Sequence, residues 1–226
     1  MKKNAEELHQ NVPPDWYYAS IKRNVFQRYW HYRRFKKVRE LIEPVEGKIL
    51  DIGSADGVFS KVVLDATGAK SLIGIDVLKS SVDWANKHWG SSRVKSRGKM
   101  KFLVGDAHNL KFPSNSFDAV FALEVLEHVF DPVKVFKEVK RVLKKDGYAI
   151  FLVPSDNFLF TIIWWFVTNF WWARIWQDCH VQSFSKKNTL ASIVAKSGLK
   201  IEEDQKFLLG MLSVVKARRP AQAGKI

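Results

Sequence analysis

The sequence is poor in cysteine and lacks an apolar leader. Cys179 is the single cysteine among 226 residues, so no internal disulfide can form, and this indicates a reducing compartment. The first residues, MKKNAEELHQ, are basic but precede no apolar run, which argues against a secretory signal. Cys179 and His180 alone do not make a metal site, and we expect no metal. These absences favour a cytoplasmic protein.

The chain also lacks charge balance. Its 37 Lys and Arg residues outnumber 23 Asp and Glu residues, which gives a net charge of +14. Residues 1–40 hold ten of the basic residues against four acidic ones. Such an excess predicts an anionic partner, either nucleic acid or an acidic membrane surface. Charge by itself does not choose between the two.

Apolar strands alternate with helical segments from residue 48 onward. Strands are predicted at 48–53, 71–76, 100–106, 116–125, 146–154, 199–207 and 211–217, and helices at 58–67, 80–89, 131–145 and 186–198. The last two strands should pair antiparallel after a tight reversal near Gly210. The pattern predicts an α/β fold with a doubly wound, mostly parallel, seven-stranded sheet.

Four regions are expected along the chain. Residues 1–43 form an N-terminal helical arm, in which 16–42 is one long helix or two joined helices and Asp15 is the N-cap. Residues 44–217 form the main domain, which carries an apolar insertion at 155–185. Residues 218–226 form a basic tail.

The first predicted strand runs into the glycine-rich turn DIGSADG, residues 51–57. A dinucleotide fold would need the pattern G-x-G-x-x-G, but the corresponding positions are Gly53, Ala55 and Val58. Pyrophosphate binding is therefore disfavoured. Carboxylates end the strands instead. Asp76 is placed to accept from ribose hydroxyls and Asp106 from an exocyclic adenine amine. With Asp51 and Glu124 they form an acidic rim that suits a positively charged ligand with many donors.

These segments resemble a known family. ILDIGSADGVFS, IGIDV, FLVGDAHNLKFPSNSFDAVFALEVLEHV and DPVKVFKEVKRVLKKDGYAIFLVPS are similar to the class I S-adenosylmethionine-dependent methyltransferases of the type 11, ubiquinone- and menaquinone-methyltransferase group. The resemblance implies a Rossmann-like methyltransferase fold and S-adenosyl-L-methionine as cofactor. It implies that the 53–57 turn, with Gly53, Ser54, Ala55 and Gly57, holds the methionine portion. It also implies that Val77 contacts adenine, that Ala107 lies beside Asp106, and that Leu123 and Glu124 face the sulfonium. Ala55 stands where many members have glycine.

Methyl transfer from a sulfonium needs positioning more than acid–base chemistry. A base is needed only where the acceptor must lose a proton. His128, after the fourth strand, is the first candidate and His180 the second, although each could equally be a structural histidine. Arg33 or Arg34 could pair with the cofactor carboxylate or could face solvent.

The stretch FLFTIIWWFVTNFWWARIW, residues 158–176, contains nine aromatic residues and is uncharged before Arg174. It is marginal as a membrane span, which needs about 20 apolar residues, and its tryptophans favour the headgroup region. It could pack as a lid on its own domain, pack on a second subunit, or lie in a membrane surface. Beside the basic arm, a lid that also contacts an anionic membrane is favoured.

The expected function is therefore methyl transfer from S-adenosylmethionine to a hydrophobic, lipid-like or isoprenoid molecule, at the inner face of a membrane. The alternatives are a soluble small-molecule methyltransferase, whose lid could be a homodimer contact, a nucleic-acid methyltransferase and a non-catalytic cofactor-binding protein. A nucleic-acid substrate is disfavoured, because Glu124-Val-Leu-Glu stands where amine-methylating relatives carry an Asn/Asp-Pro-Pro-aromatic run, and Cys179 lies in the wrong segment for a nucleophile.

Overall fold

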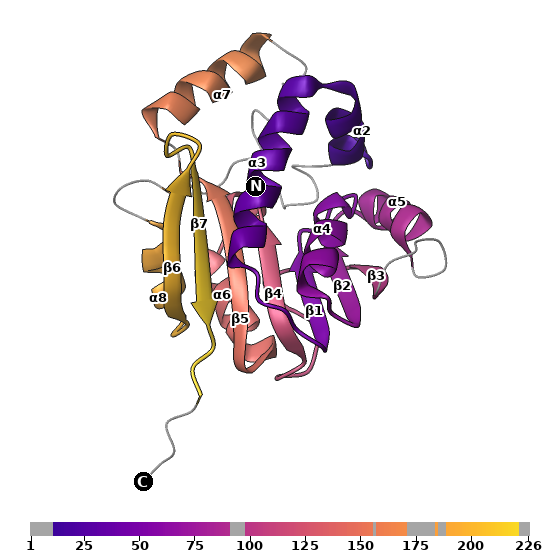
Figure 1. The fold of residues 1–226 in the computed structure, drawn as a ribbon, viewed down its shortest axis with the longest axis vertical. Helices are drawn as coiled ribbons and strands as arrows, with labels where there is room; N and C mark the ends of the chain where they lie inside the picture. Colours follow the sequence, from indigo (N-terminus) through magenta and orange to yellow (C-terminus); the bar gives the residue numbers. More distant parts are fainter. Residues whose placement is uncertain (1–10, 91–97, 156, 171–183, 185–188, 222–226) are drawn as a thin grey trace.

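A computed structural model describes residues 11–90, 98–155, 157–170, 184 and 189–221. Seven strands form one sheet in the order β3-β2-β1-β4-β5-β7-β6 (Figure 1). Their bounds are β1 Lys48–Ile52, β2 Ser71–Asp76, β3 Lys99–Val104, β4 Phe117–Leu123, β5 Leu143–Pro154, β6 Lys200–Phe207 and β7 Leu212–Arg218. The first five strands pair parallel, and β7 lies antiparallel between β5 and β6. The predicted fold class is confirmed.

Helices cover both faces of the sheet. Helices α3 (Val25–Leu41), α4 (Val58–Thr67) and α5 (Lys79–Trp89) contribute to one hydrophobic core, and α6 (Pro132–Val142) and α8 (Leu190–Ala195) contribute to the other. The central strands β1, β4 and β5 are almost wholly buried because both of their faces are packed. The strand order changes direction between β1 and β4. The crevice for a ligand is therefore expected at the carboxyl ends of these two strands.

The N-terminal segment forms two helices, α2 (Trp16–Arg23) and α3. Asn24 separates them, and its side chain accepts hydrogen bonds from the N–H groups of Phe26 and Gln27 at the start of α3. Asp15 occupies the N-cap position of α2, but its side chain makes no capping bond. The buried face of α3 consists of His31, Arg34, Val38 and Leu41, and so includes two polar residues.

Two predicted helices were too long at their C-terminal ends, and the aromatic insertion is described only in part. The helix expected over 131–145 ends at Val142, because Leu143 already pairs with Phe117 and starts β5. The described helix near the C-terminus is short, Leu190–Ala195, and part of the range 186–198 lies outside the described residues. The aromatic insertion forms helix α7, Phe158–Phe170, and its remainder also lies outside the described residues. The antiparallel β6–β7 hairpin is confirmed, with Leu208, Leu209 and Gly210 at positive φ.

Candidate active site

The turn after β1 is held in an unusual backbone conformation. Gly53, Ala55 and Gly57 have φ angles of 70°, 44° and 78°. A side chain at Gly53 would meet Val125, with Cβ 2.5 Å from its Cγ2 atom, so glycine is needed for the close approach of two strand-end turns. For Ala55 the left-handed conformation is strained, because its methyl group crowds the backbone.

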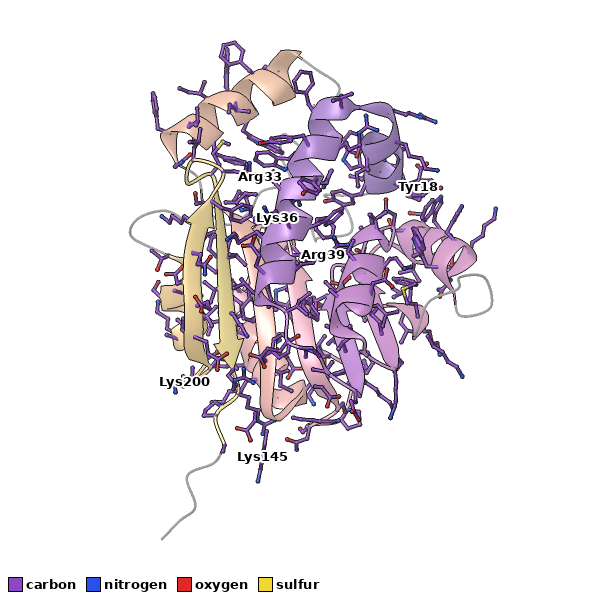
Figure 2. The ribbon with its side chains drawn as sticks, in the orientation of Figure 1. Tyr18, Arg33, Lys36, Arg39, Lys145 and Lys200 are labelled. Carbon is purple, nitrogen blue, oxygen red and sulfur yellow. The ribbon has the colours of Figure 1, made fainter. Side chains whose placement is uncertain are left out.

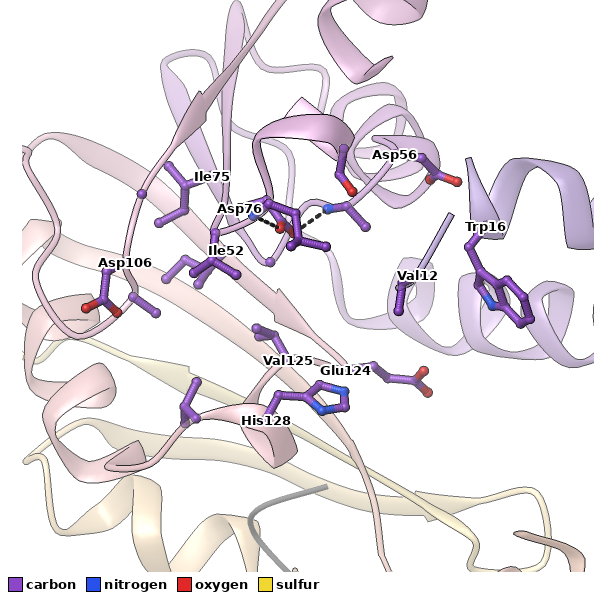
Figure 3. A pocket seen from close by; sticks show the side chains of 18 of the residues that line it. Val12, Trp16, Ile52, Asp56, Ile75, Asp76, Asp106, Glu124, Val125 and His128 are labelled. Atoms are coloured by element: carbon purple, nitrogen blue, oxygen red, sulfur yellow. Dashed lines mark hydrogen bonds between the residues drawn. The ribbon is translucent and has the colours of Figure 1, made fainter. Parts of the chain in front are cut away.

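Asp76 fixes this turn from the end of β2. One carboxylate oxygen accepts from the N–H of Ala55 at 2.9 Å and the other from the N–H of Leu78 at 2.9 Å (Figure 3). A carboxylate offers about four acceptor positions. Asp76 can therefore bind the two backbone groups and still accept from hydroxyl groups of a ligand in the adjacent cavity.

Asp106 forms a second acidic corner, together with a histidine that the sequence analysis did not select. The Nδ1 atom of His108 lies 2.7 Å from Asp106, and its Nε2 atom accepts from the N–H of Asp131 at 3.2 Å. The Nδ1 atom must then carry the proton that is donated to Asp106. Partial burial raises the pKa of Asp106, but hydrogen bonds from the backbone and the ring of His108 lower it by more. The pKa of Asp106 therefore lies below its ordinary value. The corner thus stays anionic and is tied to the start of α6.

A first cavity lies over this rim. Eight of the predicted site residues line it: Gly53, Ala55, Asp76, Val77, Asp106, Ala107, Glu124 and His128. Ile52, Ile75, Leu78, Val125 and Val129 supply apolar walls between the carboxylates. Figure 3 shows Asp76 and Asp106 on one side of this cavity and Glu124 and His128 on another.

Four predicted residues support this cavity without lining it. Asp51 is buried under the turn and accepts from the Ser60 hydroxyl, and burial raises the pKa of Asp51 to about 7. The Ser54 hydroxyl packs toward Gly74 of β2. Gly57 is the N-cap of α4, and Leu123 is buried at the end of β4. The second histidine candidate, His180, lies outside the described residues.

The N-terminal segment up to the start of α2 closes the cavity from the other side, which the sequence analysis did not predict. Val12, Pro13, Pro14, Trp16 and Tyr17 all line it. The docking point is Asp56, which accepts from the N–H of Tyr18 at 2.7 Å, while its backbone carbonyl accepts from the Trp89 indole at 2.7 Å. Burial raises the pKa of Asp56 to about 6. The sequence shows Asp56 as a second carboxylate within the glycine-rich turn, and this could have marked it as a candidate, but it does not reveal Tyr18 as the partner.

A second, larger cavity adjoins the first, and the two share Trp16, Tyr17, Glu124 and His128. Its volume is about 270 Å³ against about 100 Å³ for the first cavity. The remaining lining side chains come from α3, from α7, from the short helix after β4, from the end of β5 and from the start of β7. They are Phe26, Gln27, Trp30, His31, Arg34, Glu127, Pro154, Phe160, Ile163, Trp164 and Leu212. Six of these are apolar aromatic or large aliphatic groups: Phe26, Trp30, Phe160, Ile163, Trp164 and Leu212.

Arg34 lies in the wall of the second cavity. It is 2 % exposed, pairs with Glu124 and contacts the Nδ1 atom of His31 at 3.0 Å. Burial lowers the pKa of Arg34 to about 10, and it lowers the pKa of His31 well below its usual range, with a further contribution from Arg34. Glu124, one of the four residues that line both cavities, has a φ angle of 58°. This left-handed backbone conformation is strained in a residue other than glycine. Arg33 points outward and donates to the Tyr29 hydroxyl at 2.8 Å.

The donor and acceptor set of the first cavity fits S-adenosylmethionine. Asp76 and Asp106 supply acceptors for hydroxyl and amine groups, and the aliphatic walls accommodate a flat base. Glu124 adds a third carboxylate to the lining of this cavity, and it pairs with Arg34. No group of at least three His, Cys, Asp or Glu residues suited to a metal ion was found in the described part of the chain.

Comparison with known proteins assigns the central segment. Residues 50–151 match the family model described as a methyltransferase domain. The chain is 35 % identical over 100 residues to sterol 24-C-methyltransferase erg6 of Aspergillus fumigatus, covering 44 % of this chain and 26 % of the relative. It is 32 % identical over 129 residues to demethylmenaquinone methyltransferase of Thermotoga maritima, covering 56 % and 53 %. The chain thus spans about a quarter to about half of these curated relatives.

Solved structures agree on the fold. A Mesorhizobium loti S-adenosylmethionine-dependent methyltransferase superposes with a TM-score of 0.62 at 19 % identity, covering 81 % of this chain and 96 % of that one. The [4+2]-cyclase SpnF superposes with a TM-score of 0.71 at 16 % identity, covering 98 % of each chain. At such identities the likeness concerns architecture, and the chemistry must be argued from the site.

Proposed function

We propose that the protein is a class I S-adenosylmethionine-dependent methyltransferase and that it transfers a methyl group from this cofactor to a hydrophobic, lipid-like acceptor. Residues 50–151 match the model of a methyltransferase domain, and a solved S-adenosylmethionine-dependent methyltransferase has the same fold. The observation that carries the proposal is the second cavity, which is lined largely by apolar groups and opens onto the cofactor cavity through four shared residues. The named activities of the sterol and menaquinone relatives are consistent with such an acceptor.

The residues of this chain would bind, align and shield the reactants. S-adenosylmethionine supplies a methyl group that is already activated as a sulfonium. Asp76 and Asp106 hold the cofactor by its hydroxyl and amine groups, and Glu124, paired with Arg34, lies at the junction of the cavities. Residues 12–17 and helix α7 limit the access of water to this junction. Where the acceptor is a hydroxyl, an imidazole nitrogen of His128 takes its proton, since His128 lines both cavities.

We further propose that the acceptor is taken from a membrane surface. In Figure 1, helix α7 lies at the same end of the molecule as the start of α3 and the β6–β7 turn. Large apolar groups are exposed on all three, among them Phe158 at 82 %, Phe26 at 80 % and Leu209 at 82 %. Lys22, Arg23 and Arg28 flank the exposed Val25 and Phe26, and farther along α3 follow Arg33, Lys36 and Arg39 (Figure 2). Exposed apolar groups with a basic helix beside them suit an anionic lipid surface.

The described helices include none that is long and apolar enough to cross a membrane. Helix α7 carries one tryptophan for each proposed role, acceptor binding and contact with the membrane surface. Trp164 lines the cavity and stacks on Phe160 with ring centroids 5.7 Å apart, whereas Trp165 is 53 % exposed. These neighbouring tryptophans form a matched pair for mutation.

The test combines two assays. Labelled S-adenosylmethionine is incubated with a total lipid extract in detergent, and label in the organic phase is counted. Sedimentation with anionic and neutral vesicles measures membrane binding. Trp164→Ala should lower methyl transfer with little effect on vesicle binding, and Trp165→Ala should weaken binding to anionic vesicles while transfer in detergent persists. Equal behaviour of the two variants in both assays would contradict the proposal.

A further inference from the structure

Asp106, just after β3, is oriented by a histidine two residues later. The backbone N–H and the ring Nδ1 of His108 both reach the same carboxylate oxygen, Oδ1 of Asp106, at 2.9 Å and 2.7 Å. Among the described residues, no donor reaches the other oxygen, Oδ2. Because a carboxylate accepts about two hydrogen bonds at each oxygen, Oδ1 is fully used and Oδ2 stays available to a ligand.

The tautomer of His108 is fixed from the other side of its ring. The Nε2 atom accepts from the N–H of Asp131 at 3.2 Å, so Nδ1 carries the proton and donates it to Asp106. Asp131 is itself the N-cap of α6, where its side chain accepts from the N–H of Lys134 at 3.0 Å. The imidazole therefore connects the carboxylate to a fixed helix start, and rotation of the carboxylate breaks this connection.

Both side chains line the first cavity, in the part that is proposed to hold adenine. The Asp106 side chain is 59 % exposed, whereas that of His108 is 17 % exposed. A carboxylate so exposed and without a fixed partner would populate several rotamers, and ordering it on binding would cost free energy. His108 reduces this cost, because it orders the carboxylate before a ligand enters.

An exocyclic amine and a carbonyl present opposite groups to the available oxygen. The amine of adenine donates, whereas the carbonyl at the same ring position of hypoxanthine accepts. Burial raises the pKa of Asp106, but the hydrogen bonds from His108 lower it by more, so the carboxylate is ionised at neutral pH and can only accept. An acceptor fixed at this place favours the amine and disfavours the carbonyl.

We propose that His108 is a positioning residue that acts through Asp106: it holds the carboxylate so that Oδ2 selects a cofactor whose base carries an exocyclic amine over one that carries a carbonyl there. The ring Nδ1–H performs this role, so a side chain that keeps a donor at the same point should keep the selection. The inference rests on the proposed function, since it takes the first cavity as the cofactor site.

Calorimetry at pH 8 with two cofactor analogues tests the inference without turnover. S-adenosylhomocysteine carries the amine and S-inosylhomocysteine the carbonyl, and neither has a methyl group to transfer. The unaltered protein should bind the adenine analogue about tenfold or more tightly, as expected for a hydrogen bond to a charged acceptor. His108→Leu should narrow this ratio to about threefold or less, because Asp106 is then able to turn away. His108→Asn should keep the ratio within about twofold of the parental value, because its amide N–H can take the place of the ring Nδ1–H.

His88→Leu is the matched control, and it should leave the ratio unchanged. His88 is an exposed histidine on α5 whose Nδ1 atom donates to the carbonyl oxygen of Trp84 at 2.9 Å, and it does not line the first cavity. A merely structural role of His108 would weaken the binding of both analogues equally. An unchanged ratio in His108→Leu therefore overturns the inference, and so does an equal narrowing in His108→Leu and His108→Asn.

Two results with the unaltered protein separate this inference from the proposed function. Equal affinity for the two analogues overturns the role of His108 and leaves the cofactor cavity standing. Absence of binding by both analogues rejects the cofactor cavity itself, and the inference fails with it.

Discussion

The two halves of the site are built in different ways. The cofactor half takes its carboxylates from consecutive strand ends, Asp76, Asp106 and Glu124, within one continuous stretch of the chain. The acceptor half is assembled from α2, α3, the loop after β4, α7 and the start of β7. The first is fixed by the sheet, and the second exists only where helices dock over it. Cofactor chemistry can therefore persist while the acceptor wall changes.

The largest effect is expected where the halves meet. Arg34→Leu leaves the partly buried Glu124 without its partner, and removing one member of a buried pair typically costs about 3–5 kcal/mol. The free energy of unfolding, measured by urea titration, should fall by about that amount. Arg33→Leu is the control, since Arg33 loses mainly a hydrogen bond to Tyr29 and should change stability by less than about 0.5 kcal/mol. Equal effects of the two variants would show that α3 is not anchored through Arg34.

The next effect should be confined to the cofactor half. Asp76→Ala removes the acceptor of two backbone N–H groups and of the ribose hydroxyls. Hydrogen bonds to a charged group contribute about 1.5–3 kcal/mol each, so affinity for S-adenosylmethionine should fall by about 100-fold or more in calorimetry. Binding of an acceptor-like probe should be much less affected. Asp65→Ala, on the exposed side of α4, should leave both affinities unchanged. If both ligands are lost in a folded Asp76→Ala protein, the halves are not separable.

A pH effect should arise from the support beneath the cofactor turn. Burial raises the pKa of Asp51 from 3.8 to about 7, so between these values the folded chain holds a proton that the unfolded chain has released. Stability contributed by this group therefore falls as pH rises from about 4 to about 7. Asp51→Asn removes that dependence and can still accept from Ser60. As the pH rises from about 4 to about 7, the melting temperature of the variant should increase relative to that of the parent. A constant difference between the two melting temperatures over this pH range would contradict the raised pKa of Asp51.

The smallest effect concerns Ala55. Its φ angle of 44° is unfavourable for alanine by about 1 kcal/mol relative to glycine. Ala55→Gly should raise the free energy of unfolding by at most about that amount, with cofactor affinity within about twofold of the parent. A clear loss of stability would show that the Ala55 methyl group has packing value that outweighs its strain.

Prediction from sequence succeeded where one segment decides the structure. Strand–helix alternation gave the sheet class. The strand-end carboxylates gave three residues of the first cavity, and the family resemblance and the search for a base gave five more. It failed where partners are distant in the chain. No local pattern indicates that Asp56 receives the N–H of Tyr18, 38 residues earlier, or that Arg34 reaches Glu124. The end of α6 was misplaced because strand pairing with Phe117, rather than helix propensity, decides the conformation of Leu143.

The sequence by itself determined the order of the strands along the chain, the acidic rim and the match of residues 50–151 to the model of a methyltransferase domain. Hydrophobic periodicity and turn residues act over a few positions, and they are legible without the fold. The tertiary structure decided which rim residues reach the first cavity, that residues 12–17 close it, and that Arg34 lies buried beside Glu124. Those outcomes depend on packing between remote segments, where burial and charge compensation are set only once the helices have docked on the sheet.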